Sequence, residues 1–330
     1  MFMFSDFVEI PFPLRQEGAW PPGLFPFAPL ELEFAAAGEL RWPEYKGGLF
    51  RSGLGLFFRQ QACTTGAASC HGCPHMARCA YSLVFENPIL PGQAAVLRRY
   101  THAPHPFVLR PPLEPGTRMA PGEVFRAGLT VFSSALDFLP ELLEAFDRMG
   151  GSGGYGGRFQ LRRVLSALTG VELARREGDG WQQPPPVWTP APVRGPVRAV
   201  RLEFLTPLRI RTYGRYNPRP GFIAITHALL RRLHLLSAVH ANGSRENGWM
   251  RPLLERADRI VTRRAEWRLY RWSRPSGRQQ AAIPMDGLIG TLEAEGELTP
   301  FMPYLEAGQW LQIGSGTSAG LGAYRLTAAC

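Results

Sequence analysis

The sequence predicts an α+β protein made of two tandem ferredoxin-like domains, and three observations lead to this fold class. The 330 residues are enough for two domains of ordinary size, and 45% of them are hydrophobic, as in globular chains. Glycine-rich stretches occur twice, at 150–157 and 314–322, and an arginine follows each. Each half also has the order strand, helix, strands and closing glycine loop, which is typical of ferredoxin-like domains.

Apolar periodicity predicts the elements of the amino-terminal half. The alternating run 27–34 predicts a strand, and Phe50, Leu54 and Phe57, at i, i+4 and i+7, predict a helix over 49–61. Further strands are predicted at 81–85, 107–109 and 123–132, with a helix over 138–149.

The proline-rich stretch 181–192 predicts a stiff, extended linker between the two halves. We therefore expect an amino-terminal domain at 1–189, with a cysteine cluster inserted at 63–79, and a carboxyl-terminal domain at 190–330. In the second domain we predict strands at 197–204, within 259–272 and at 287–295, and a helix over 222–239. The glycine stretch 314–322 is predicted to be a hairpin between the final two strands of the chain.

The glycine stretch 314–322 is a candidate anion-binding loop. It contains Gly314, Gly316, Gly320 and Gly322, and glycine lets backbone N–H groups turn towards a phosphate. Arg325, which follows the loop, can add a guanidinium clamp. An ordinary glycine-rich turn explains the same pattern. A Walker loop is excluded, because no Gly-Lys-Ser/Thr follows.

The charge balance predicts a polyanionic partner. The net charge is +10, and Lys46 is the only lysine among 37 basic residues. Ten arginines lie within 245–278, against four carboxylates. Arg264, Arg268 and Arg271 are our candidate RNA contacts, because arginines interleaved with aromatic residues suit phosphates and stacked bases. The alternative is a solvated charged face, and a GC-rich genome also explains the arginine bias.

Four cysteines have a spacing that predicts a structural zinc site. They are Cys63, Cys70, Cys73 and Cys79. The central Cys-x2-Cys spacing lets two thiolates bind the same tetrahedral zinc ion. Reduced core thiols and iron–sulfur ligation are the alternatives. The chain begins without a signal-peptide pattern and has no run of eighteen apolar residues, so we expect a cytoplasmic location and no membrane partner.

Several separated motifs resemble one known superfamily. The run 43–55 resembles the start of repeat-associated mysterious proteins (the RAMP superfamily). The run 70–86 is similar to the cysteine segment of one branch, the CRISPR precursor-RNA-processing endoribonucleases. Further similar segments of the carboxyl-terminal half lie at 204–209, 230–233, 272–274, 285–290 and 313–324.

This resemblance implies tandem ferredoxin-like domains that bind and cut CRISPR repeat RNA to mature crRNA. Cleavage would need no metal, because the upstream 2′-hydroxyl attacks and leaves a 2′,3′-cyclic phosphate. The family also implies that the protein can stay with the crRNA among effector-complex subunits. The alternative function is a crRNA-binding subunit that does not cut.

Candidate catalytic groups lie around the first predicted helix. Many family members carry a histidine just after this helix, where the present chain has His71 and His75. We predict His75 as the proton-transfer residue, because His71 lies between two cysteines that would be held by a metal. Lys46 would then supply positive charge and Tyr45 would orient the attacking hydroxyl. Arg51, off the apolar face of the helix, is a further candidate RNA contact.

Overall fold

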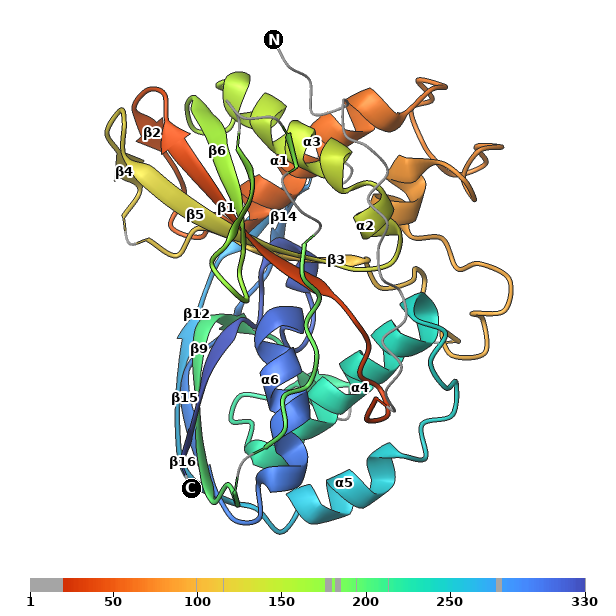
Figure 1. Ribbon diagram of the computed structural model, residues 1–330, viewed down its shortest axis with the longest axis vertical. Helices are drawn as coiled ribbons and strands as arrows, with labels where there is room; N and C mark the ends of the chain where they lie inside the picture. The colour runs from red at the N-terminus through yellow and green to blue at the C-terminus, as the bar shows by residue number, and fades with distance from the viewer. Residues whose placement is uncertain are drawn as a thin grey trace. The chain divides into compact units, whose positions relative to one another are not determined.

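The structure is a computed structural model that describes residues 20–98, 100–114, 116–175, 180–181, 185–193, 195–212, 214–276 and 281–329. It divides into two compact units (Figure 1). The amino-terminal unit contains Pro26–Trp188, and the carboxyl-terminal unit contains Ala19–Phe25 and Thr189–Cys330. The short segment before the first strand therefore belongs with the second unit, which the sequence did not indicate.

The amino-terminal unit has the βαββαβ order of a ferredoxin-like domain. Its sheet has the strand order β3-β5-β1-β6, all antiparallel, and β7 and β8 extend it beyond β6. The bounds are β1 (Ala28–Ala36), β2 (Leu40–Arg41), α1 (Gly47–Ala62), β3 (Phe107–Arg110), β4 (Arg118–Met119), β5 (Val124–Val131), α2 (Ser134–Asp137), α3 (Leu139–Gly151), β6 (Phe159–Ser166), β7 (Glu172–Arg175) and β8 (Gly180–Trp181).

The carboxyl-terminal unit repeats this topology with the strand order β12-β15-β9-β16. The bounds are β9 (Ala199–Leu208), β10 (Arg211–Thr212), β11 (Arg215–Tyr216), α4 (Phe222–His240), α5 (Met250–Ala257), β12 (Val261–Tyr270), β13 (Ser273–Ser276), β14 (Ala281–Pro284), β15 (Gly287–Glu295), α6 (Met302–Leu311) and β16 (Tyr324–Ala329). The predicted fold class, α+β with two tandem ferredoxin-like domains, is confirmed.

Two predicted elements are wrong. Residues 81–85 do not form a strand but belong to the π-helical turn η2 (Ser82–Glu86), in which Tyr81 and Phe85 stack with their ring centroids 5.5 Å apart. The glycine stretch 314–322 does not join two strands as predicted, because Met302–Leu311 before it is the helix α6. The glycine stretches consequently join α3 to β6 and α6 to β16, the same position in both units.

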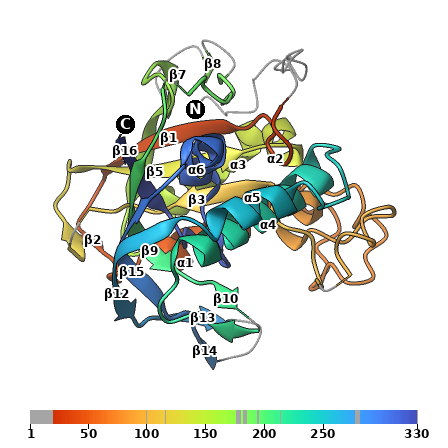
Figure 2. The same ribbon diagram turned by 90° about the horizontal axis from the view of Figure 1, so that it is seen from below.

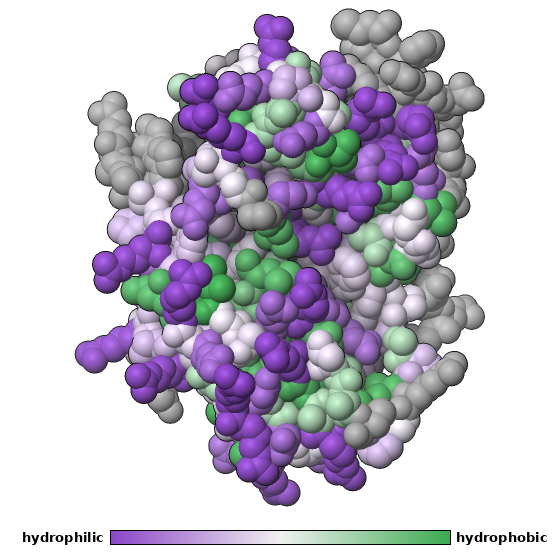
Figure 3. Space-filling model, turned by 90° about the vertical axis from the view of Figure 1, so that its left-hand side faces the viewer, coloured by the Kyte–Doolittle hydropathy of each residue, from purple (hydrophilic) through white to green (hydrophobic). Residues whose placement is uncertain are grey.

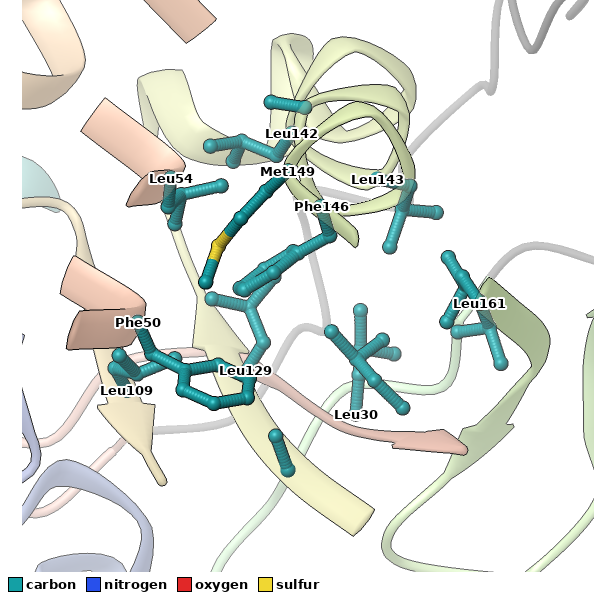
Figure 4. Close-up of a cluster of buried hydrophobic side chains, with 14 of the residues drawn as sticks. Leu30, Phe50, Leu54, Leu109, Leu129, Leu142, Leu143, Phe146, Met149 and Leu161 are labelled. Atoms are coloured by element: carbon teal, nitrogen blue, oxygen red, sulfur yellow. The ribbon is translucent and has the colours of Figure 1, made fainter. Parts of the chain in front are cut away.

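Buried hydrophobic side chains, among them Phe50 and Phe146, hold α1 and α3 on the sheet of the amino-terminal unit (Figure 4). Phe34 of β1 stacks on Phe125 of β5 at 5.0 Å and meets Phe50 of α1 edge-on at 6.4 Å. At Gly53 of α1, an added Cβ would overlap the side chain of Met149 in α3. A glycine inside this helix is therefore explained by the close approach of the two helices.

The core of the carboxyl-terminal unit lies between its sheet and the helices α4 and α6. Phe222 of α4 packs edge-on against Phe301 at 5.4 Å, and Tyr324 of β16 donates a hydrogen bond to the carbonyl of Leu305 in α6. By length and composition alone, α4 also suits a membrane span. Core helices of globular domains pass the same test, and half of this apolar window is buried within the protein.

The opposite face of the amino-terminal sheet carries a buried carboxylate held by two arginines. Glu33 is only 8% exposed and accepts hydrogen bonds from Arg163 at 2.7 Å and Arg126 at 2.9 Å. The hydrogen bond from Arg163, followed by that from Arg126, lowers the pKa of Glu33 below its usual value and outweighs the opposing effect of burial.

We predict that Glu33→Gln destabilises the protein by about 1.5–3 kcal/mol at pH 7, because a charge-assisted network is lost. Since the folded state holds the lower pKa, this stabilisation is present above the unfolded value near ~4.3 and is lost as the pH falls through the folded pKa. Urea unfolding at pH 7 and pH 3 measures the difference. Glu39→Gln, which removes an exposed partner of Arg41, is the control. An equal loss in both variants would contradict the prediction.

Candidate functional site

The glycines of the loop 314–322 are required by its backbone. Gly314, Gly316, Gly320 and Gly322 have φ values of 92°, 83°, 84° and 79°, a region that residues with a Cβ rarely adopt. At Gly322 an added Cβ would overlap the carbonyl oxygen of Ile313, and at Gly314 that of Arg209. A side chain at Gly322 would thus disturb the fold before it met any ligand.

Most amides of this loop bond within the unit, and one segment remains open. The amide of Ser315 donates to the carbonyl of Arg209 at 3.0 Å, and that of Gly322 to Pro207 at 3.1 Å. The amides of Thr317 and Ser318, which begin a 3₁₀ turn, donate to no described residue. Ser318 is half-buried and Ser315 is exposed. The side of the loop that can meet a ligand is therefore 315–318.

The predicted arginine contacts divide into paired and unpaired groups. Arg325 pairs with Glu203 at 2.9 Å, and Arg264 pairs with Glu266 at 2.6 Å. Arg268 and Arg271 are exposed and form no ion pair with a described residue. The side of the carboxyl-terminal sheet in Figure 3 carries projecting hydrophilic side chains between apolar ones. The unpaired arginines keep their full charge for an anion.

Lys46 has a structural contact that its sequence position did not reveal. It is 4% exposed, and its Nζ donates to the carbonyl oxygen of Glu114 at 3.0 Å. Burial is the main cause that lowers the pKa of Lys46. Its neighbour Tyr45 is half-buried, and both residues precede the first turn of α1.

His75 lies at the opposite end of α1 from these two residues. It lines a pocket together with Cys63 and Cys79, which flank the loop that follows the helix, and the Cys79 Sγ contacts the Ala62 carbonyl at 3.9 Å. The 16 residues of α1 extend over roughly 24 Å, at about 1.5 Å per residue. The structure therefore does not bring His75 together with Tyr45 and Lys46.

The histidines differ in whether their imidazole nitrogens are available. His71, His75 and His227 are exposed, and their side chains have no partner among the described residues. His102 is 3.0 Å from the hydroxyl of Thr101, whereas His234 is buried. Proton transfer requires an accessible ring nitrogen, so the first three remain candidates.

Arg51 forms a contact that sequence reasoning missed. Its guanidinium lies 4.5 Å from the ring centroid of Phe85 and 5.6 Å from that of Phe107, and one nitrogen is 2.8 Å from His105 Nε2. Arg51 and His105 are 54 residues apart, and no local pattern indicates such a pairing. This predicted RNA contact thus has its guanidinium between aromatic rings of its own unit.

The four cysteines line one small pocket with His75, and each is half-buried. Burial raises the pKa of the Cys70 thiol, whereas hydrogen bonds with Thr65 and Gly66 lower that of Cys63. Across the described parts of the chain, no three His, Cys, Asp or Glu side chains already have the arrangement of a metal site. The loop brings the thiols to one place without the geometry of a closed shell.

Two family models match this chain, one in each unit. The model of the CRISPR-associated endoribonuclease Cas6 matches residues 202–324, from β9 to the start of β16. A second family model, AF_1859_N, described as an N-terminal domain, matches residues 25–186. Over residues 202–324 the carboxyl-terminal unit is therefore similar to the Cas6 endoribonuclease family. This confirms the resemblance seen in the sequence, while membership of the branch with the cysteine cluster stays a prediction.

Solved structures share the fold at low sequence identity. Thermus thermophilus Cas6 (TTHB231) has 18% identity and a TM-score of 0.50, covering 92% of this chain and 98% of its own. The Cas6 (TTHB231) product complex has 20% identity, a TM-score of 0.50, and 92% and 100% coverage. A chain of the partial Cas6-RT-Cas1–Cas2 complex has 12% identity and a TM-score of 0.53, with 92% of this chain matching 46% of that one. Among curated proteins, no sequence matches this chain significantly.

Proposed function

We propose that this protein is a metal-independent endoribonuclease that cuts CRISPR repeat RNA to mature crRNA and leaves a 2′,3′-cyclic phosphate. The observation that carries the proposal is the Cas6 endoribonuclease match over residues 202–324, on a fold of two ferredoxin-like units. The net charge of +10 suits an RNA substrate. Association of the product with CRISPR effector subunits belongs to the same proposal.

The reaction needs two proton transfers. The 2′-oxygen attacks the adjacent phosphorus while a base removes its proton, and the bond to the 5′-oxygen breaks as an acid protonates that oxygen. We assign proton transfer to His75, because its imidazole is exposed and has no partner in the described structure. Lys46 and Tyr45 lie at the other end of α1, and Lys46 already bonds to Glu114. We therefore expect them to support the fold there.

Cleavage of a labelled repeat RNA in EDTA tests the proposal. The wild-type protein should give a product ending in a cyclic phosphate, and His75→Ala should cut roughly 10²–10⁴-fold more slowly with nearly unchanged RNA affinity. His71→Ala is the matched control, because it removes a second exposed imidazole from the same loop. If His75→Ala cuts at the wild-type rate, the assignment to His75 fails, and tyrosine- or arginine-based catalysis replaces it.

A crRNA-binding subunit that does not cut is the second candidate function. The observation in its favour is the separation of His75 from Tyr45 and Lys46, which leaves the sequence-predicted catalytic group dispersed. The EDTA assay decides between the two. Tight binding of the repeat RNA without a cleavage product would favour the binding subunit.

For RNA binding we propose the open side of the glycine loop and the unpaired arginines Arg268 and Arg271. Thr317 and Ser318 offer amides that can donate to phosphate oxygens. The paired arginines Arg264 and Arg325 contribute less, because each is already neutralised by a glutamate.

We predict that Ser318→Asp weakens repeat-RNA binding at least about tenfold at low salt, because a carboxylate would face the phosphates. Ser318→Asn introduces a side chain of nearly the same shape as aspartate but without its charge, so this variant should bind the RNA as the wild type does. Fluorescence anisotropy at 50 mM and 300 mM salt measures both variants. Equal affinity of the two would show that this loop does not approach the RNA.

We also propose a structural zinc ion at Cys63, Cys70, Cys73 and Cys79. Support comes from their spacing and from the single pocket that all four line. The intervening residues contain turns, such as the bond from the Cys73 amide to the Cys70 carbonyl, that allow the sulfurs to converge. Four thiolates would close the coordination shell, so the metal would order the loop and take no part in cleavage.

About one zinc per chain is expected by mass spectrometry of protein purified under reducing conditions. Cys73→Ser should lose the metal and lower the thermal unfolding midpoint, because it removes one of the two thiolates of the Cys-x2-Cys pair. Cys330→Ser, outside the cluster, is the matched control. Wild-type protein without stoichiometric metal would refute the site.

A further inference from the structure

A second pocket lies in the carboxyl-terminal unit, away from the glycine loop. Its volume is about 200 Å³, the room of roughly seven waters at ~30 Å³ each, so one planar ring system fits. Its lining includes Gly23, Leu24, His234, Ser237, Ser244 and Trp249. These residues come from three places in the chain: the segment before β1, the helix α4, and the loop between α4 and α5.

Trp249 forms an ordered aromatic wall. Its indole stacks on Tyr304 at 5.9 Å with an interplanar angle of 14°. On another side the indole meets Gly23, where φ is +83° and an added Cβ would lie about 2.5 Å from the ring. The amide of Leu24 donates to the carbonyl of Pro21 at 3.0 Å and closes the turn that carries Gly23. The turn and the indole are therefore fitted to each other.

Two polar side chains of low exposure line the pocket, and one of them, His234, has its ring 6.2 Å from the indole of Trp249. His234 and Ser237 are 6% and 5% exposed, and their spacing of three places them on one face of α4. Neither side chain has a hydrogen-bond partner among the described residues. Their polar atoms are not among the fully buried side-chain atoms that lack a partner, so they open onto the pocket, where a ligand can bond to them.

The chemistry of these groups selects a neutral, flat, polar ligand. Burial lowers the pKa of His234, so its imidazole is neutral at pH 7 and offers one donor and one acceptor. A neutral imidazole and a hydroxyl beside an indole match the edge and the face of a nucleobase. Arg245, exposed and directly after Ser244, can reach a phosphate attached to such a base.

We propose that this pocket binds a nucleobase, with His234 and Ser237 at the base edge and Trp249 beside the ring. The base can belong to an RNA strand or to a free nucleotide, since both present the same edge. The site goes beyond the cleavage proposal, because binding of a base here needs no cut RNA and no residue of the amino-terminal unit.

Equilibrium dialysis of the full chain tests the site with nucleosides, 5′-mononucleotides and single-stranded RNA pentamers. His234→Phe should weaken binding about tenfold or more, His234→Gln should retain most of it, and Arg245→Gln should weaken only phosphate-bearing ligands. His227→Phe removes an exposed imidazole of the same helix and should leave the binding of these ligands unchanged. The thermal unfolding midpoint of His234→Phe should stay level or rise, because an apolar ring replaces an imidazole that has no hydrogen bond to a described residue.

Comparing the ligands shows whether the bound base belongs to an RNA strand or to a free nucleotide. Pentamers that bind at least tenfold more tightly than mononucleotides identify an RNA strand, and equal affinities identify a free nucleotide. The proposal is overturned if no ligand class binds, or if His234→Phe binds as the wild type does. Should His234→Phe fail to fold, Ser237→Val provides the same comparison. None of these readouts depends on cleavage, so failure here leaves the endonuclease proposal intact.

Discussion

Each sheet can bury only one of its faces, and most features of the two units follow from this constraint. In the amino-terminal unit the ring of Phe34 anchors the covered face under α1 and α3, while the neighbouring Glu33 on the other face is held by two arginines. The carboxyl-terminal sheet has the same alternation, with Phe204 inside and the Arg325–Glu203 pair outside. Strand arginines are thus largely used within the fold. Unpaired cations for a polyanion lie at edges and connections, such as Arg268 on the edge strand β12.

The two glycine stretches show how one sequence pattern serves folding before it serves a ligand. One joins α3 to β6 and the other joins α6 to β16, where the chain must reverse beside other backbone. At Gly157 and Gly322 positive φ combines with a carbonyl so close that a Cβ would overlap it. The glycines are therefore needed whether or not RNA approaches. Within the segment 315–318 of the second loop, the amides of Thr317 and Ser318 donate to no described residue and remain for an external anion.

The fold could be predicted from the sequence because periodicity and element order are local properties. The helices at 49–61, 138–149 and 222–239 were all placed within a few residues. The helix α6 was missed because its glycine and proline residues disguise a short buried helix, and η2 because Tyr81 and Phe85 also suit a strand. The sites depend on contacts across the chain. The burial of Lys46 against Glu114 and the pairing of Arg51 with His105 leave no local pattern.

The cysteine loop links the two proposals made for the amino-terminal unit. Residues 63–79 form neither helix nor strand, and ordering one backbone residue costs about 1–2 kcal/mol. A histidine on such a loop transfers protons efficiently only if it is held in position. Structural zinc sites supply roughly 10–16 kcal/mol of binding free energy, enough to order a segment of this length. A metal at the four cysteines would therefore stabilise the loop that carries His75, while the chemical step itself would use no metal.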